Sequence, residues 1–393
     1  MRLLGFKYLK RQRILTLALI ITLSSMLFSI TALSLLGFYR GFTAYLGEGE
    51  DIVVVYDRRS RTPFTGLVPV YLSERISALN GVLASSPEAI APCLLKGEAI
   101  FIRGIIPEGF TKLNRITITD GSMLELDDVN SIIVGKNVAE RLHLKPGDKV
   151  LVLGALTDQY LELQIKGIYT SHSPMDDEAL APLYVGQWLR GTGYGHVTLI
   201  RFKIDRSAIS PARIFEEIAK EASELSPAPS TKPELQPQSI IPRITSRFRI
   251  EDVGIDEAQR FMKSYMDRYG VTREAILILS VIVFLFSSIS IATATKTLIT
   301  QHRGEIQVLR SVGASQKTVK TDLLAKLLFW SLAASAAGIT LATAILWLVE
   351  GKGYLQVLSH TISFQLDLVV IALNFILVSL LVSVSILRAK MEL

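Results

Sequence analysis

Charged residues are absent from four long stretches of this 393-residue sequence. These stretches are 14–38, 275–295, 327–349 and 368–387. At a rise of about 1.5 Å per residue, a helix of about 20 residues crosses the roughly 30 Å apolar core of a bilayer. Ion and proton carriers place ionisable side chains at membrane depth, so their absence argues against a conduction pathway through the protein. We predict four transmembrane helices.

Cysteine occurs only once, which excludes a disulfide within the chain. The single residue, Cys93, lies between the first two apolar stretches. We interpret it as a small buried hydrophobic residue, and the alternative is a bridge to another molecule.

Motifs for nucleotide and metal chemistry are also missing. GASQKT, which starts at Gly313, has Gln316 where a G-x-x-x-x-G-K-[ST] phosphate loop needs its second glycine. HEXXH, paired CXXC and GXSXG are absent. HSPMDDE at 172–178 gathers one histidine and three carboxylates in one loop without a recognised ligand spacing, so we interpret it as a solvated loop rather than a metal site. We expect no enzyme activity in this chain, no cofactor and no metal ion.

Positive charge is concentrated in three short segments. The first 13 residues carry five positive and no negative charges, 296–326 carries six positive and two negative, and 388–393 carries two positive and one negative. The segment 40–273 is nearly neutral, with 28 positive and 30 negative residues. By the positive-inside rule, we predict a multi-pass plasma-membrane protein with both termini and 296–326 in the cytoplasm and the large domain outside. The net charge of +6 therefore reflects membrane topology, and we expect no nucleic-acid binding.

The first apolar stretch follows a basic N-terminal segment, as the core of a signal peptide does. Its 25 uncharged residues exceed the roughly 7 to 15 of a cleaved signal, and no small-x-small cleavage site ends it. We predict an uncleaved anchor.

The segment 40–273 alternates short apolar runs with helix-like pieces. The predicted strands are 52–55, 99–105, 131–134, 149–153 and 161–165. Pro146 and Gly147 suit the two central positions of a type II turn. Because strands and helices interleave without the regular spacing of a parallel sheet, we predict an α+β domain.

Two helices are predicted near the end of this domain. The first, 211–225, is followed by a segment with five prolines, 226–242, which we interpret as a linker or an extended excursion. The second, 256–269, is separated from the next apolar stretch by little more than Gly270. We predict one helix that continues through the membrane surface, and the alternative is an independent surface helix.

A compact charged segment, RGEIQVLRSVGAS at 303–315, separates the second and third apolar stretches. Ile306 and Gly313 share a helical face with His302, which we expect to be solvated or interfacial. Gly313 suits a left-handed helix end, and Ser315 can cap the next helix. We predict a short amphipathic helix beneath the membrane that docks a cytoplasmic partner, and the alternative is an interfacial anchor.

Small residues gather in the third apolar stretch. Ala333 with Ala337 and Ala334 with Gly338 form overlapping small-x-x-x-small pairs, which allow two helices to approach closely. We predict a packing face that serves either this chain or a dimer.

Seven residues of the 303–315 segment match the pattern R-x-E-I-x-x-L-R-x-x-G-A. They are Arg303, Glu305, Ile306, Leu309, Arg310, Gly313 and Ala314. This pattern resembles the signature of the FtsX-type domain in MacB/FtsX/LolC-like ABC transporter permeases. SIIVGKNVAERLHLKPGDKVLVLG and LELQIKGIY resemble the MacB-type periplasmic core, and the order of one span, a large outer domain and three spans is similar. The resemblance covers nearly the whole chain.

The resemblance implies a permease that forms a homodimer or heterodimer in the lipid bilayer and is served by a separate ABC ATPase subunit. The residues that it assigns to ATPase docking are Arg303, Glu305, Ile306, Leu309 and Arg310, with Gly313 and Ala314 shaping the turn. ATP-driven movement would reach the outer domain and export or extract an amphipathic, peptide or lipid-linked cargo. The alternative is a transmitter that moves nothing and regulates an extracellular partner protein such as a cell-wall hydrolase.

The predicted fold is an α-helical membrane protein with four transmembrane helices and a large α+β extracytoplasmic domain inserted between the first and second helices. The four spans are predicted at 14–39, 274–295, 327–349 and 368–387. On the cytoplasmic side we predict the N-terminus at 1–13, the coupling loop at 296–326 and the tail at 388–393. On the outer side we predict the large domain with its stalk helix at 40–273 and a short loop at 350–367.

Overall fold

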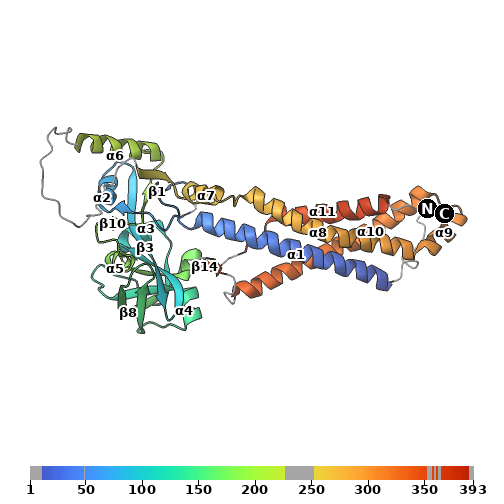
Figure 1. Cartoon of the computed structure of the whole chain (residues 1–393), viewed down its shortest axis with the longest axis horizontal. Helices are drawn as coiled ribbons and strands as arrows, with labels where there is room; N and C mark the ends of the chain where they lie inside the picture. Colours follow the sequence, from blue (N-terminus) through green and yellow to red (C-terminus); the bar gives the residue numbers. More distant parts are fainter. Residues whose placement is uncertain are drawn as a thin grey trace, which may run out of the picture. The chain divides into compact units, whose positions relative to one another are not determined.

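The computed structural model of the chain describes residues 11–47, 49–225, 252–351, 356–357, 360–361 and 364–388. By their internal contacts the residues fall into two compact units. The helical unit takes in the residues up to Arg40, Gly270–Leu355 and the residues from Ile362 onward. The sheet unit takes in Gly41–Tyr269 and Gln356–Thr361. Figure 1 draws the elements of both units, coloured along the sequence.

Four long helices make up most of the helical unit (Figure 1). They are α1 (Arg11–Ala44), α8 (Arg273–Gln301), α10 (Gln316–Gly351) and α11 (Leu368–Arg388). Among the described residues, these four helices are the ones that are long and apolar enough to cross a membrane. The short helix α9 (Arg303–Ser311) joins α8 to α10.

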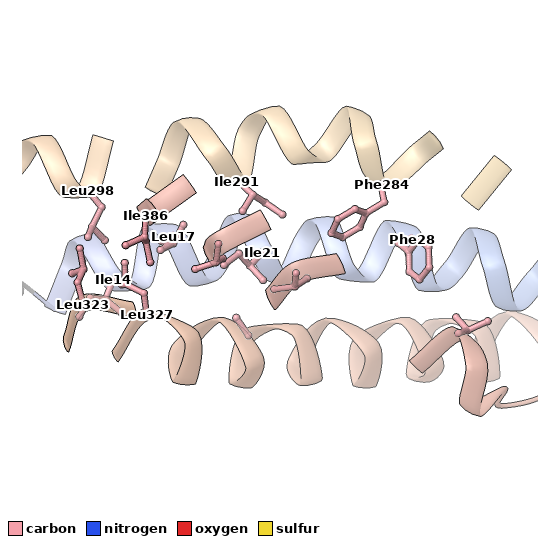
Figure 2. Close-up of a cluster of buried hydrophobic side chains, with 14 of the residues drawn as sticks. Ile14, Leu17, Ile21, Phe28, Phe284, Ile291, Leu298, Leu323, Leu327 and Ile386 are labelled. Atoms are coloured by element: carbon pink, nitrogen blue, oxygen red, sulfur yellow. The ribbon is translucent and has the colours of Figure 1, made fainter. Parts of the chain in front are cut away.

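Large apolar side chains from all four long helices form the core of the helical unit (Figure 2). Ile21 of α1, Leu327 of α10 and Ile386 of α11 are almost fully buried in it. Phe28 of α1 meets Phe284 of α8 edge to face, with ring centroids 5.7 Å apart. This arrangement of two aromatic rings is favourable, because the positive edge of one ring lies against the negative face of the other.

Helices α1 and α10 approach closely where α10 carries small residues. A Cβ atom added at Gly338 would lie 2.5 Å from the carbonyl oxygen of Thr22, closer than real Cβ contacts allow. The Thr22 hydroxyl donates a hydrogen bond to the carbonyl of Ala334 at 3.0 Å. Ala334 and Gly338 are buried, whereas Ala333 and Ala337 are exposed. The two predicted small-residue pairs thus lie on different sides of α10, and one of them contacts α1.

A small polar cluster crosses the apolar core of the helical unit. The side-chain amide of Asn374 in α11 donates to the carbonyl of Ser25 at 3.2 Å and to the hydroxyl of Ser29 at 3.0 Å. The Ser335 hydroxyl of α10 donates to the Asn374 carbonyl oxygen at 3.2 Å. Since a buried polar group without a partner is costly, these bonds favour one rotational setting of α1, α10 and α11.

A ten-stranded mixed sheet organises the sheet unit. Its order is β12-β1-β11-β3-β4-β9-β6-β8-β5, and β7 pairs with both β3 and β8. The strands are β1 (Ile52–Asp57), β3 (Val82–Leu95), β4 (Glu98–Ile105), β5 (Thr117–Gly121), β6 (Ser131–Gly135), β7 (Lys149–Gly154), β8 (Tyr160–Thr170), β9 (Glu178–Pro182), β11 (Leu199–Ile204) and β12 (Val253–Glu257). The pairs β4–β9 and β6–β8 are parallel, and the others are antiparallel.

Short helices and two small ribbons complete the sheet unit. The helices are α2 (Tyr71–Ser77), α3 (Pro107–Leu113), α4 (Lys136–Leu142), the 3₁₀ turn η2 (Pro174–Asp177), α5 (Leu183–Arg190), α6 (Pro211–Leu225) and α7 (Ala258–Arg268). The ribbons pair β2 (Val68–Pro69) with β10 (His196–Val197) and β13 (Gln356–Val357) with β14 (His360–Thr361). The predicted fold class is confirmed, with the α+β domain lying in sequence between the first and second long helices.

Local sequence signals in this domain are confirmed where turn chemistry and apolar runs coincide. All five predicted strands are present, within β1, β4, β6, β7 and β8. Gly147 adopts a positive φ of 95°, as a type II turn requires of its third residue. The thiol of Cys93 is buried in the sheet core, where burial raises its pKa to about 12. The proline-rich segment 226–242 lies outside the described residues.

The prediction of one continuous helix from the outer domain into the second span is wrong. Helix α7 ends at Arg268, and α8 begins only at Arg273. Gly270 takes a left-handed φ of 72°, and the Thr272 hydroxyl accepts a hydrogen bond from the amide of Ala275 at 3.1 Å. A left-handed glycine followed by a threonine cap ends one helix and starts another, so two helices form here.

Candidate coupling helix and a buried charge cluster

Helix α9 is set between α8 and α10 by signals that its own sequence supplies. Gly313 takes a positive φ of 98°, and its amide donates to the carbonyl of Arg310 at 3.0 Å. The Ala314 amide donates to the carbonyl of Leu309 at 3.1 Å, so the last turn of α9 is closed by the residues that follow it. The Ser315 hydroxyl then accepts from the amide of Thr318 at 3.2 Å and caps α10.

The predicted docking residues of α9 do not all lie on one exposed surface. Ile306 is almost fully buried in the core of the helical unit, and Ala314 packs partly against the same core. Leu309, Glu305 and Arg310 are half-buried.

Two exposed apolar residues lie at the end of α9 at positions that the motif leaves open: Val308 within the helix and Val312, its C-terminal cap residue. Val308 is 63% exposed and Val312 is 83% exposed. They are four residues apart at the end of the helix, so their side chains lie near one another. Arg303 and Gly313 are also exposed. Ile306 thus anchors the helix, and the valines are the side chains that offer apolar surface to a partner.

The expectation that His302 is solvated or interfacial is wrong. Its side chain is 1% exposed, and its Nδ1 lies 2.8 Å from the carbonyl oxygen of Leu298. The turn between α8 and α9 folds the imidazole inward, because it bonds a carbonyl at the end of α8 that the helix itself leaves without a partner.

The expectation that 172–178 is a solvated loop is also wrong for its three acids, although His172 is exposed. Asp176, Asp177 and Glu178 are buried. Asp176 accepts hydrogen bonds from the hydroxyls of Thr170 and Ser171, at 2.9 and 2.7 Å. Each acid has its own protein partners, and no group of three or more His, Cys, Asp or Glu residues in the described chain is arranged to hold a metal ion.

Four fully buried charged side chains meet in the sheet unit, and we call them the charge cluster: Glu88, Arg103, Glu178 and Arg201. Arg103 Nε donates to Glu178 at 2.8 Å, and another guanidinium nitrogen of Arg103 pairs with Glu88. Arg201 Nε donates to Glu88 at 2.6 Å. Two cations and two anions balance, which offsets much of the cost of removing each charge from water.

Further side chains surround Glu178 in the charge cluster. The hydroxyl of Tyr45 donates to its carboxylate, and the guanidinium of Arg103 lies over the Tyr45 ring, 4.8 Å from its centroid. Burial alone would raise the pKa of the Glu178 carboxyl, but the charge of Arg103 and the hydrogen bond from His360 outweigh it and lower the pKa from 4.5 to about 2. Glu178 is therefore ionised and accepts hydrogen bonds only.

Sequence reasoning missed the charge cluster, although a signal was present. Arg103 lies in the apolar run AIFIRGI and Arg201 in LIRFKI. Glu88 lies within the long strand β3. A charged residue inside an otherwise buried strand is rarely tolerated without an opposite charge, so each of these residues implies a partner.

Comparison with known families decides the identity of the chain. Residues 14–213 match the MacB-like periplasmic core domain, and residues 277–391 match the FtsX-like permease C-terminal domain. The chain belongs to the MacB/FtsX-type permeases. It is a membrane subunit of an ABC permease, a multi-pass protein with a large extracytoplasmic domain. Permeases of the FtsX family pair with an ABC ATPase and typically lack a nucleotide-binding domain of their own.

Solved structures of related domains were also found, and no curated protein matched the chain. The periplasmic region of MacB from Actinobacillus actinomycetemcomitans is 12% identical, with a TM-score of 0.36, and the match covers 55% of this permease and 92% of that chain. The extracellular domain of the ABC-type transporter YknZ from Gram-positive bacteria is 17% identical, with a TM-score of 0.32, and the match covers 44% of this permease and 91% of that chain.

Proposed function

We propose that this permease couples ATP hydrolysis by a separate ABC ATPase subunit to movements of its outer domain. The observation that carries the proposal is α9, a short helix that is anchored by buried Ile306 and leaves Val308 and Val312 exposed. An anchored helix with a small exposed apolar face and flanking charges suits a partner that presses on the helix without displacing it.

In this proposal the motif residues divide into three roles. Ile306 and Ala314 hold α9 on the helical unit, and Gly313 forms the turn into α10. Arg303, Glu305, Leu309 and Arg310 provide the charged and half-buried edge of the docking surface. Val308 and Val312 provide its apolar centre.

The proposed topology places α9 in the cytoplasm. The segment 296–326 carries a net positive charge, as does the N-terminal segment, whereas 40–273 is close to neutral. The positive-inside rule supports cytoplasmic termini and an outer domain on the other side of the plasma membrane. The predicted boundaries of the four spans are retained as part of this proposal.

We propose that the permease works as a dimer, with itself or with a related permease. Ala333 and Ala337 are exposed on α10, and their spacing leaves a shallow helix face that a second chain can approach. The cargo in this proposal is an amphipathic, peptide or lipid-linked molecule that is moved or extracted on the outer side. The lack of charged residues in the four apolar stretches supports movement outside the membrane rather than through it.

The second candidate function uses the same ATPase and moves no cargo. In it, the outer domain transmits ATP cycling to an extracellular protein such as a cell-wall hydrolase. The absence of charges in the apolar stretches favours this function as much as cargo extraction, because neither needs a pathway through the bilayer. Capture of a stable protein by the outer domain would favour the transmitter, and bound cargo would favour transport.

The test is copurification of the native permease with its ATPase in mild detergent, followed by measurement of ATP turnover. We expect V308D/V312D to lose the ATPase and its stimulation, because two carboxylates at the apolar centre cannot be desolvated by a partner. E305A/L309A removes part of the edge and is expected to weaken binding less. Q316D, at an exposed position in the first turn of α10, is the matched control for added negative charge. Full copurification and turnover with V308D/V312D would exclude docking at α9.

A further inference from the structure

The hairpin β13–β14 lies in sequence between α10 and α11, yet its contacts place it in the sheet unit. Gln356 pairs with Thr361 and Val357 with His360 in antiparallel register. Four residues separate the hairpin from the end of α10, and six separate it from the start of α11. The chain therefore leaves one membrane helix, joins the outer domain and returns to the next membrane helix over a short distance in sequence.

His360 inserts into the charge cluster. Its Nε2 lies 3.0 Å from Glu178 Oε1, and its side chain is 12% exposed. The imidazole stacks on the ring of Phe101, with centroids 5.6 Å apart, and meets the ring of Tyr45 edge to face at 5.2 Å. Because ionised Glu178 is an acceptor only, Nε2 carries the hydrogen of this bond whether the imidazole is neutral or protonated.

Thr361 holds the acid next to Glu178. Its amide donates to Asp177 Oδ2 at 2.8 Å, and its hydroxyl donates to the same oxygen. The Asn137 amide donates to the Thr361 hydroxyl oxygen at 3.2 Å, and Arg141 pairs with Asp177 at 3.3 Å. Two consecutive hairpin residues thus bind two consecutive buried acids of η2 and β9.

These contacts are stronger than those of an ordinary surface loop. Hydrogen bonds to an ionised carboxylate are roughly twice as strong as bonds between neutral groups, and burial increases the difference. If the hairpin leaves, Glu178 loses one of its donors and Phe101 and Tyr45 lose an aromatic neighbour. The hairpin is held by charge and packing together.

We propose that the β13–β14 hairpin is a permanent clasp that ties the chain between α10 and α11 to the outer domain. Movement of the outer domain is then passed to the last two membrane helices as well as through α1 and α8. The transmission of movement rests on the proposed function. The docking of the hairpin does not, because it is a property of the permease itself. A short chain segment transmits tension well, since it cannot extend beyond about 3.3 to 3.6 Å per residue.

Hydrogen–deuterium exchange on the full permease in detergent tests the docking. We expect H360A/T361A to speed exchange at least tenfold in β14 and in the amides of η2 and β9. H360Q keeps a side-chain N–H donor and is expected to lose less. H143N is the control, because His143 is exposed and has a left-handed φ that asparagine tolerates. Unchanged exchange in H360A/T361A would overturn the clasp.

A cross-link tests whether the clasp is permanent. N137C/T361C, made together with C93A, joins two side chains whose polar atoms lie 3.2 Å apart. With the ATPase bound, we expect the oxidised N137C/T361C variant to hydrolyse ATP at least as fast as its reduced form, because the disulfide replaces the contacts that Asn137 and Thr361 supply. We expect H360A/T361A to lower stimulated turnover several-fold. Turnover that stops on oxidation and returns with a reductant would show a clasp that opens in each cycle, against the proposal. If the unmodified permease fails to stimulate any ATPase, the proposed function fails while the exchange result still decides the docking.

Discussion

Replacement of Arg103 by methionine tests whether the charge cluster stabilises the outer domain. Methionine keeps much of the apolar length of the side chain and removes its charge. Arg103 is fully buried and donates to both Glu88 and Glu178, so its loss leaves two buried anions with only Arg201 as a buried cation in the charge cluster. Breaking a buried ion pair from one side costs about 3 to 5 kcal/mol. That is a large share of the roughly 5 to 15 kcal/mol that stabilise a typical domain.

Native-state hydrogen exchange gives a direct measurement of this loss in the full permease. The amides of β4 and β9 lie beside the charge cluster, and we expect them to exchange slowly and to report the opening of the outer domain. A loss of about 3 to 5 kcal/mol corresponds to exchange about a hundred to several thousand times faster, at about 1.4 kcal/mol for each factor of ten.

The matched control is K136M, which breaks an exposed pair in the same unit. Lys136 Nζ lies 3.7 Å from Glu140 Oε1, and both side chains are more than half exposed. Such a pair contributes at most about 0.5 kcal/mol, so exchange should change little. In R103M/E178Q the orphaned anion is also removed, and part of the protection should return. Equal effects of R103M and K136M, or no recovery in the double variant, would refute the reasoning.

Three further predictions follow from single sites. G338A should destabilise the helical unit by about 1 to 3 kcal/mol, because the added Cβ would lie 2.5 Å from the carbonyl oxygen of Thr22. Thermal unfolding in detergent measures this loss. The control A336L, at an exposed position of the same helix, should not destabilise the unit. Acidification from about pH 4.5 toward 2 should remove about 3 kcal/mol of outer-domain stability. The pKa of Glu178 is lower in the folded state than in the unfolded state, so in this pH range the unfolded state is protonated at Glu178 while the folded state still holds it ionised. E178Q should abolish that pH dependence. Cys93 should react with a maleimide in the native permease at least a hundredfold more slowly than after denaturation, because burial hides the thiol and raises its pKa to about 12. Rapid labelling of the native permease would support the alternative of a bridge to another molecule.

Sequence reasoning succeeded where the physical signal is local. An uncharged stretch of 20 residues or more has few alternatives to a membrane helix, and all four were found. Gly313 and Ser315 mark a helix end and the next helix start through their own backbone and side-chain bonds, so α9 could be predicted from its neighbours in sequence. The α+β domain followed from strand patterns separated by turns.

Sequence reasoning failed where the deciding contact is distant in the chain. Glu178 meets Arg103 across 75 residues and His360 across 182. In 172–178, Asp177 and Glu178 are buried because their partners come from α4, from β4 and from the hairpin. Asp176 instead bonds Thr170 and Ser171, which lie nearby in the sequence. The prediction for His302 failed although the deciding contact is local, because its imidazole bonds the carbonyl of Leu298, four residues earlier in α8. The helix break at Gly270 is likewise local, because glycine readily takes the positive φ that ends a helix.

The two units of the permease solve the same packing problem with different forces. In the outer domain, water drives apolar strands together strongly enough to bury the charge cluster at its centre. In the helical unit that drive is absent, because lipid is as apolar as leucine, and helices associate through close contact and hydrogen bonds. Exposed leucines such as Leu19 and Leu23 of α1 therefore tolerate exchange for other apolar residues, whereas Gly338 and Asn374, which a hydropathy profile undervalues, fix how α1, α10 and α11 fit together. Substitutions that damage assembly of this permease should concentrate at such small and polar positions.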